Sequence, residues 1–108
     1  MASDLSFVLY VTDSVKGSGI IEHKKMFGEY LVYANGKPAF LICDNTVYVK
    51  MWDFLADRLG KAEIGEPYKG AKPHYMVDPD DCGLMREVVR DICKLAPVPK
   101  PKRKKPTV

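Results

Sequence analysis

Two tight-turn signals inside one long run of alternating apolar residues constrain the fold of this chain more than any other feature. Asn35-Gly36 and Asp44-Asn45 separate stretches in which every second residue is apolar. Asn-Gly between such stretches is the strongest short-range signal for a β-hairpin, and Asp and Asn tolerate the same left-handed backbone. The sequence therefore predicts an antiparallel β-meander. Its strands are predicted over residues 20–26, 29–34, 37–43 and 46–51, with a bend or bulge at Phe27-Gly28.

Two-residue turns also predict which side chains share a face of this sheet, because side chains alternate along each strand. One face is predicted to be uniformly apolar and to pack on helices: Leu31, Tyr33, Phe40, Ile42, Val47 and Val49. The other face is predicted to hold Tyr30, Val32, Ala39, Leu41, Cys43, Tyr48 and Lys50. The second face mixes apolar side chains with tyrosines and a lysine, so we expect it to be covered in part or by another subunit.

Helical signals precede and follow the meander. Ser3 and Asp4 are predicted to cap a helix that ends near Gly17, although the apolar run 7–11 also fits a buried strand. A short helix is predicted over residues 53–59, closed by Gly60. A proline-containing loop over residues 65–73 and a short strand over 74–77 come next.

The last predicted element is an amphipathic helix. Asp78, Asp80 and Asp81 crowd its start, where negative charge suits the helix dipole, and the helix ends before a proline-rich tail. Its apolar stripe is predicted to be Leu84, Val88, Ile92 and Leu95. The fold class is therefore α+β with two layers, an antiparallel meander packed with N-terminal, short middle and C-terminal helices. One domain is predicted over residues 1–96, with a disordered Pro/Lys-rich basic tail over 97–108.

Positive charge is concentrated in that tail. The whole chain has 17 basic and 14 acidic residues, and the tail holds five of the basic residues and none of the acidic ones, which leaves 12 basic against 14 acidic elsewhere. The net charge is thus −2 for the domain and +5 for the tail. The basic residues are Lys100, Lys102, Arg103, Lys104 and Lys105. Such a run can neutralise phosphates of a nucleic acid, and the alternative is a solvated terminus that aids solubility.

A second candidate for nucleic-acid or partner binding is the predicted sheet face that carries Tyr30, Tyr48 and Lys50. Aromatic rings beside a cation on an exposed sheet can stack on bases, as they do in RNA-recognition folds. A covering helix or a dimer contact explains the same residues equally well. These three residues are therefore predicted as a binding face with packing as the alternative.

Catalytic, metal and cofactor motifs are weak throughout the sequence. Gly65 to Lys72 approximates a phosphate loop, but its lysine stands one place late and no Ser or Thr follows. His23, His74 and Cys43 lack the short spacing that is diagnostic of metal ligands. We therefore predict no catalytic residue, no metal site and no cofactor, and we expect the protein not to be an enzyme.

Cysteine use and hydropathy bear on the cellular compartment. Cys43, Cys82 and Cys93 are odd in number and have no CxxC spacing, which fits reduced thiols rather than a disulfide framework. The longest apolar runs, 7–11 and 39–43, are far shorter than the about 20 residues that a membrane span needs. The first residues do not resemble a signal peptide. We expect a cytoplasmic protein with no membrane partner.

The segment Lys24-Lys25-Met26-Phe27-Gly28-Glu29-Tyr30 resembles the N-terminal domain of the TfoX/Sxy competence regulators. That family has an opening helix, a basic strand ending in Met-Phe-Gly, a Tyr-containing strand, a Gly-containing turn and a Leu-Tyr-Val-Lys-like strand. The later matching pieces are Tyr33-Ala34-Asn35-Gly36-Lys37, Phe40-Leu41-Ile42, Val47-Tyr48-Val49-Lys50, Gly65-Glu66-Pro67-Tyr68 and Pro73-His74-Tyr75. The resemblance covers about Ser3 to Leu95 in order.

The resemblance implies a two-layer α+β fold, a bacterial cytoplasmic protein and a role in transcription regulation, with no catalytic residues. Full-length TfoX/Sxy proteins act with the cyclic-AMP receptor protein and carry a second, helical domain, where this chain has its Pro/Lys tail. The resulting hypothesis is a non-enzymatic regulatory module that binds nucleic acid, a transcription complex or a second copy of itself. The alternatives are a small-ligand-binding domain or enzyme using the Gly65–His74 loop with Lys72, and a protein–protein adaptor using the Tyr30–Tyr48 face.

Overall fold

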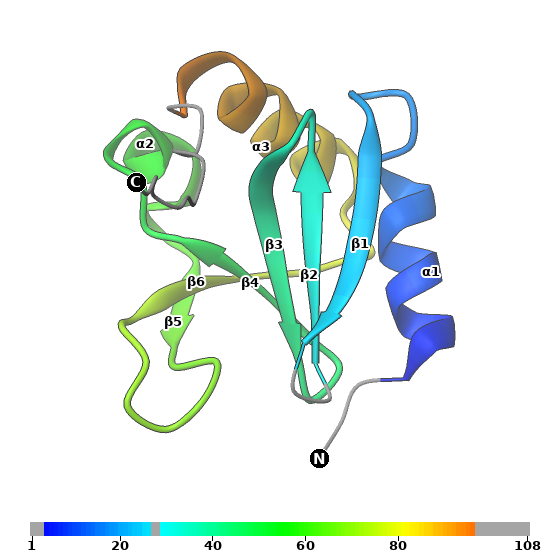
Figure 1. Ribbon diagram of the computed structural model, residues 1–108. Coiled ribbons are helices and arrows are strands. Elements are labelled where there is room, and N and C mark those ends of the chain that lie inside the picture. The colour runs from blue at the N-terminus through cyan, green and yellow to red at the C-terminus, as the bar shows by residue number, and fades with distance from the viewer. Residues whose placement is uncertain (1–3, 27–28, 97–108) are drawn as a thin grey trace, which may run out of the picture.

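The two turn signals do produce the meander, because the turn residues adopt the left-handed backbone that tight hairpins require. In the computed structural model, which describes residues 4–26 and 29–96, Asn35 and Gly36 have φ angles of 53° and 80°, and Asp44 and Asn45 have φ angles of 51° and 55°. The strands are β1 (Ile21–Met26), β2 (Glu29–Ala34), β3 (Lys37–Cys43) and β4 (Thr46–Lys50). Each pairs antiparallel with the next (Figure 1).

Two further strands extend the sheet beyond β4. Strand β6 (His74–Val77) pairs with β4, and β5 (Glu63–Gly65) pairs with β6 at the outer edge. Among the described residues the sheet has six strands in the order β1-β2-β3-β4-β6-β5. The short strand at 74–77 was predicted. Strand β5 was not, because three residues are too few to show an alternating pattern.

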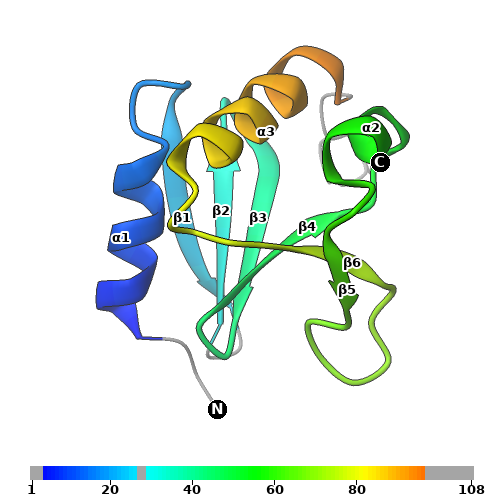
Figure 2. The ribbon, with the colours of Figure 1, turned by 180° about the vertical axis from the view of Figure 1, so that it is seen from behind.

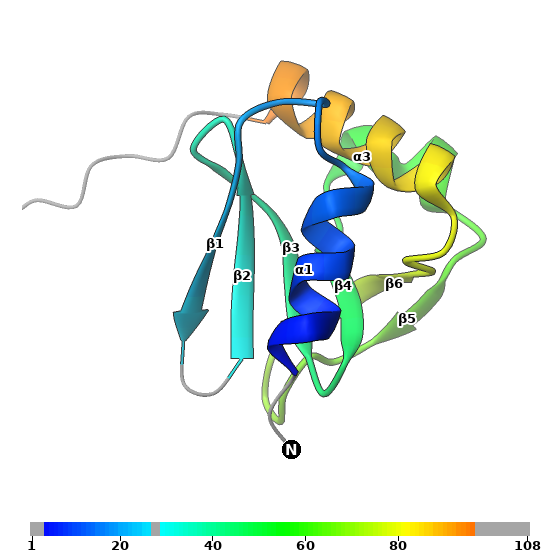
Figure 3. The same cartoon turned by 90° about the vertical axis from the view of Figure 1, so that its right-hand side faces the viewer.

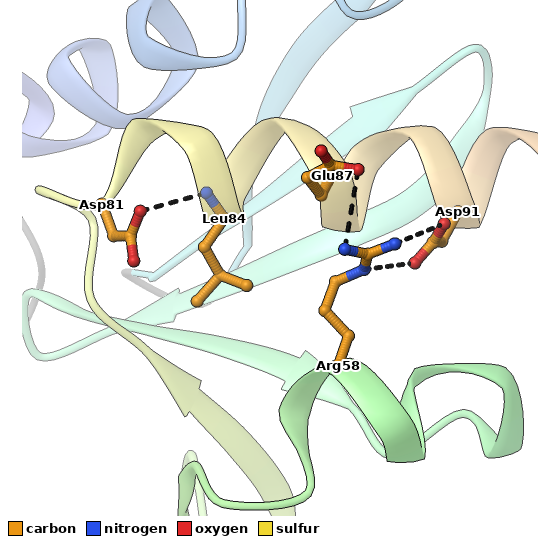
Figure 4. Close-up of polar contacts among 5 residues, drawn as sticks. All are labelled: Arg58, Asp81, Leu84, Glu87 and Asp91. Carbon is orange, nitrogen blue, oxygen red and sulfur yellow. Dashed lines mark hydrogen bonds and ion pairs between the residues drawn. The ribbon is translucent and has the colours of Figure 1, made fainter.

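The structure contains the three helical segments that the sequence predicts. They are α1 (Leu5–Ser14), the 3₁₀ turn η1 (Asp53–Leu55) with α2 (Ala56–Leu59), and α3 (Cys82–Leu95). The segment around residues 7–11 is therefore helix and not strand. Asp81 caps α3, since its carboxylate accepts a hydrogen bond from the Leu84 main-chain N–H at 3.1 Å (Figure 4). Asp4 precedes α1, but its side chain makes no capping hydrogen bond.

Both long helices pack on the same face of the sheet. Helix α1 contacts β1 and α3, while α3 contacts β2 and β3 (Figures 1 and 2). Figure 3 shows both helices on one side of β1 and β2. The core lies between these layers and includes Val8 and Val11 of α1, Val88 and Ile92 of α3, and Phe40 of the sheet, all of which are at most 1% exposed.

The apolar stripe of α3 differs from the prediction. Val88 and Ile92 are buried as expected, but Leu95 is 54% exposed, and Met85 and Val89 are fully buried in its place. The buried face of α3 is thus turned toward residues 85 and 89, and Leu95, in its final turn, is not covered.

The short middle helix is tied to α3 by charged side chains. The Nε of Arg58 on α2 donates to Asp91 Oδ2 at 2.7 Å, and its Nη1 lies 3.5 Å from Glu87 Oε1 (Figure 4). Beneath this contact Leu55 and Leu59 are buried. The contact fixes α2 on the helical layer, away from the opposite face of the sheet.

A β-bulge overturns the predicted faces of β2. Tight two-residue pairing would place Val32 opposite Ala39, but the register shifts between Val32 and Tyr33, so that Val32 lies opposite Phe40. Pro38 has no N–H to donate to the ladder, and a bulge accommodates such a residue inside a sheet. The extra residue lies in β3, so all the side chains of β2 exchange faces relative to the prediction.

After this correction, the face that packs on the helices holds Tyr30, Val32, Ala34, Phe40, Ile42, Val47, Val49, Tyr75 and Val77, all of them buried. The predicted positions in β3 and β4 on this face are confirmed. Leu31 and Tyr33 belong to the opposite face. In residues 4–26 and 29–96 there is no helix long and apolar enough to cross a membrane. Residues 97–108, predicted as a disordered tail, lie outside the described part of the chain.

Candidate binding surface

The sheet face turned away from α1 and α3, here called the open face, carries one continuous row of side chains. The strand registers place Leu31 opposite Leu41, Leu41 opposite Tyr48, and Tyr48 opposite Met76. The same row begins at Lys24 on β1 and ends at Glu63 on β5. A row of apolar and aromatic groups thus crosses the middle of the sheet with opposite charges at its two ends.

The side chains of this row are only half covered. Leu31, Leu41, Tyr48 and Met76 all have intermediate exposure, whereas their strand neighbours on the other face are buried. Among the described residues, no helix is packed across this face, since α1 and α3 both contact the sheet from its other side (Figure 3). The open face is therefore a surface and not a second core.

At one end of the open face, four residues form a compact group, here called the β4–β6 cluster: Tyr48, Lys50, Trp52 and His74. The Lys50 Nζ lies 4.3 Å from the centroid of the Trp52 ring, within the range of a cation–π interaction. The rings of Tyr48 and His74 meet edge to face, with centroids 6.5 Å apart. Lys50 is exposed and the three rings are half-buried.

Local backbone structure brings these residues together. Lys50 ends β4 directly opposite His74 at the start of β6. The Trp52 N–H then donates to the Lys50 carbonyl at 2.8 Å, a tight turn that returns the indole toward the lysine side chain. Phe54 stacks on the indole, with centroids 5.4 Å apart and planes 19° from parallel. Trp52 thus contacts both an aromatic ring and a cation.

Two polar groups of the cluster, the Tyr48 hydroxyl and the His74 Nδ1, have hydrogen-bonding roles that their surroundings define. Burial is the main cause that raises the pKa of Tyr48 above its ordinary value, so its hydroxyl keeps its proton and can donate a hydrogen bond. The His74 Nδ1 lies 2.8 Å from the Lys72 carbonyl oxygen, which can only accept, so the contact requires a proton on Nδ1. The cluster therefore offers donors and ring faces beside a positive charge.

The predicted face that combined Tyr30 with Tyr48 and Lys50 is wrong. Tyr30 is 8% exposed on the helix face, opposite Ile42, and its ring meets His23 edge to face at 6.0 Å. Tyr48 and Lys50 lie on the open face. The bulge is the physical reason, because it moves Tyr30 to the other side of the sheet. The adaptor hypothesis that combined Tyr30 and Tyr48 on one face loses its premise.

The structure does not reach the predicted basic residues Lys100, Lys102, Arg103, Lys104 and Lys105, which lie outside the described residues. Their part in binding stays a prediction. The loop alternative stays a prediction as well. The structure joins Lys72 and His74 through the Lys72 main-chain carbonyl, which leaves the lysine ammonium out of the contact.

Sequence reasoning missed Trp52 and the role of His74 in the cluster. Trp52 follows Lys50 by two residues. If the alternation of β4 is continued past the end of the strand, it predicts Trp52 on the same face as Lys50. His74 had no such signal, because the pairing of β6 with β4 joins residues 24 positions apart and no local pattern encodes it. Tyr33 was assigned to the helix face and lies on the open one.

The described residues also include the histidines and cysteines that were considered as metal ligands or nucleophiles. No group of three His, Cys, Asp or Glu side chains there is arranged to hold a metal ion. The three cysteines are all described and none is in a disulfide: Cys43 is buried, Cys82 is exposed and Cys93 is intermediate. Burial raises the pKa of the Cys43 thiol to about 11, so it is protonated at neutral pH.

Comparison with known proteins identifies a protein of similar sequence. No family model matches the chain. The "uncharacterized 12.7 kDa protein in trpE 5′ region" of Spirochaeta aurantia is 31% identical over 107 residues, which cover 97% of this chain and 93% of that protein. The similarity therefore extends over nearly all of both chains and is not confined to a short motif.

Proposed function

The chain belongs to the same family as the 12.7 kDa protein of Spirochaeta aurantia, and we propose that it is a non-enzymatic regulatory module that binds single-stranded nucleic acid on the open face of its sheet. The observation that carries the proposal is the β4–β6 cluster. There the Lys50 ammonium lies 4.3 Å from the Trp52 ring centroid, beside the rings of Tyr48 and His74, on the face without a covering helix in the described residues.

Single-stranded nucleic acids are bound by proteins that combine ring faces with nearby cations. Base–aromatic stacking contributes about 1–3 kcal/mol per base, and it tolerates any sequence because every base has a flat face. The Tyr48 and His74 rings lie on the paired strands β4 and β6, Trp52 follows β4 by two residues, and Lys50 supplies charge for a neighbouring phosphate. Lys24, at the other end of the open-face row, adds a second positive charge.

Bulk charge does not favour binding by the domain, since residues 1–96 carry 12 basic and 14 acidic residues. Phosphate contacts must therefore come from local groups. Lys100, Lys102, Arg103, Lys104 and Lys105 are proposed to add a sequence-independent electrostatic contribution to the affinity. The regulatory part of the proposal rests on the resemblance to the TfoX/Sxy N-terminal domain, and so does the proposed cytoplasmic, bacterial setting.

The test is fluorescence anisotropy with labelled single- and double-stranded DNA and RNA over a salt series. The variant Lys50→Glu changes an exposed charge at the cluster, and Lys94→Glu makes the same change on α3, in the other layer. We expect Lys50→Glu to weaken binding of single strands and to lower the salt slope by about one, whereas Lys94→Glu stays near the parent. Equal binding by all three proteins would refute the role of the cluster.

A truncation separates the tail from the sheet. If residues 97–108 supply phosphate contacts, the 1–96 chain should bind every nucleic acid more weakly and with a smaller salt slope, while keeping its preference for single strands. A truncation that abolishes the preference itself would assign recognition to the tail and not to the open face.

A second candidate function follows from the apolar middle of the open face. Leu31, Leu41 and Met76 are half-exposed neighbours without charge between them, which suits a protein partner better than a nucleic acid. If no nucleic acid binds at low salt, a protein-binding role of the same face is the better hypothesis.

A further inference from the structure

Among the described residues, strand β1 forms an edge of the sheet, and its side chains carry an unusual pattern of charges. The strand order places β1 at one end, paired on one side with β2. Edge strands present unpaired main-chain N–H and C=O groups, and natural proteins protect such edges or use them for association. We propose that β1 pairs antiparallel with β1 of a second copy about a twofold axis at His23, joining two sheets into one.

The main-chain groups available for this pairing are set by the bonds to β2. The Ile20 carbonyl accepts a hydrogen bond from the Asn35 N–H at 2.8 Å, so residue 20 directs its groups toward β2. In an antiparallel pair this direction alternates from residue to residue. The main-chain groups of Ile21, His23 and Lys25 therefore point away from the sheet, and His23 lies at the centre of this set.

Twofold symmetry then dictates the side-chain pairs. An axis perpendicular to the sheet keeps every side chain on its own face and, when centred on His23, places Ile21 opposite Lys25 of the second copy. On the open face it places Glu22 opposite Lys24, and by symmetry Lys24 opposite Glu22. Because both strands have the same sequence, the Glu22–Lys24 ion pair forms twice across the interface. Opposite charges directly across a pair stabilise it, whereas like charges destabilise it.

Neighbouring registers lack this complementarity. Centring the axis on Lys24 would place Lys24 opposite its own copy and His23 opposite Lys25, which brings positive groups together. A strand of unrelated sequence would leave Glu22 and Lys24 without matching charges, and both side chains are exposed in the single chain. The charges that protect this edge from indiscriminate pairing therefore select a second copy in one register.

The surface of α1, the helix beside this edge, also favours a second copy of the chain as the partner. A groove between α1 and β1 is lined by Leu9 and Thr12 of the helix, by Lys16 just after it, and by Ile21 and His23 of the strand, among others. Leu5 and Leu9 lie one turn apart on α1 and are 49% and 48% exposed, although Val8 and Val11 on another side of the same helix are fully buried in the core. A helix that is apolar on both sides is expected to be covered on both.

The proposed pairing of two β1 strands would also cover this exposed apolar surface. The groove opens along the helix-face side of β1, where Ile21 and His23 project, so a second β1 with its own α1 would border it directly. Ile20, which precedes β1 and is 71% exposed, lies at the end of the same edge. Main-chain bonding, charge pairing and apolar burial thus converge on one interface between copies.

A charge-swap experiment on the full chain tests the register, with sedimentation velocity measured over a range of protein concentrations. Glu22→Lys and Lys24→Glu each turn both ion pairs into like-charge pairs. Each is expected to raise the dimer dissociation constant roughly tenfold to a hundredfold, because two cross-strand pairs change sign. Lys94→Glu makes the same change of charge on α3 and should leave the dimer intact.

Two rescues distinguish this pairing from any other. The double variant Glu22→Lys/Lys24→Glu restores both ion pairs with reversed polarity and should dimerise like the parent. An equimolar mixture of the two single variants should form heterodimers, since positions 22 and 24 are then both lysine in one chain and both glutamate in the other. A parent chain that is monomeric at every concentration, single variants that still dimerise, or a failure of both rescues would each overturn the proposal. Circular dichroism of every variant confirms that the exposed substitutions leave the fold unchanged.

Discussion

Replacing Asn35 with alanine should destabilise the protein by an amount that the turn geometry allows to be worked out. Asn35 has a φ angle of 53°, its main-chain N–H donates to the Ile20 carbonyl, and its side-chain Oδ1 accepts the Ile20 N–H at 2.8 Å. Alanine at this φ costs roughly 1–2 kcal/mol. Losing the side-chain hydrogen bond adds about 1 kcal/mol, which gives a total of about 2–3 kcal/mol.

Two further variants separate the two contributions. Asn35→Gly tolerates the positive φ but loses the side-chain bond and gains freedom in the unfolded chain, so it should cost about 1–2 kcal/mol. Asn35→Asp keeps an acceptor and tolerates the left-handed backbone, so it should stay close to the parent. The expected order of stability is parent, Asp, Gly and then Ala.

Urea unfolding followed by circular dichroism and Trp52 fluorescence measures these differences as shifts in the free energy of unfolding. The corresponding fall in Tm for Asn35→Ala is about 10–20 °C for a domain of this size. An alanine variant within about 0.5 kcal/mol of the parent would refute the whole account, since both effects would then be absent. Glycine as damaging as alanine would refute the backbone contribution alone.

Three other outcomes are expected. Ellman's reagent at neutral pH should label the exposed Cys82 at once and Cys43 only after denaturation, because burial raises the pKa of Cys43 to about 11; equal rates would contradict this. A double-mutant cycle on Arg58 and Asp91 with alanine should give a coupling energy of about 0.5–1 kcal/mol, and additivity would show that the pair contributes nothing. The hydrogen bond to a carboxylate raises the pKa of Tyr10 from 10.0 to about 12, so its contribution to stability is present below pH 10 and is lost between pH 10 and 12. In urea titrations at pH 8 to 12, Tyr10→Phe should lack that loss, and a parallel decline would argue against the bond.

The meander and its turns were predictable because their information is local. Asn35-Gly36 and Asp44-Asn45 encode their backbone within two residues, and the alternation of β3 and β4 places Phe40, Ile42, Val47 and Val49 correctly on the helix face. The same holds for α3, whose start is marked by Asp81.

The predictions that failed depended on one inserted residue in β3 and on the pairing of strands that lie far apart in the sequence. The bulge near Pro38 shifts the register by one position, and a shift of one reverses the face of every residue of β2 relative to Phe40, Tyr30 among them. Proline signals that a ladder bond is missing but not whether the chain bends, ends or bulges there. The β4–β6 cluster was hidden for the second reason, since His74 reaches Lys50 through a loop whose path no periodicity describes.

The order of the strands also has a consequence for how the molecule folds during synthesis. Strands β1 to β4 pair with their sequence neighbours, so the meander over residues 21–50 can form from short loops soon after it is made. Its helix face cannot be closed then, because α3 supplies Met85, Val88 and Ile92 to the core and comes last among the described elements. Nascent chains therefore pass through an interval with an assembled sheet and an uncovered apolar side. We expect that interval, and not formation of the hairpins, to be where this chain is most prone to aggregate.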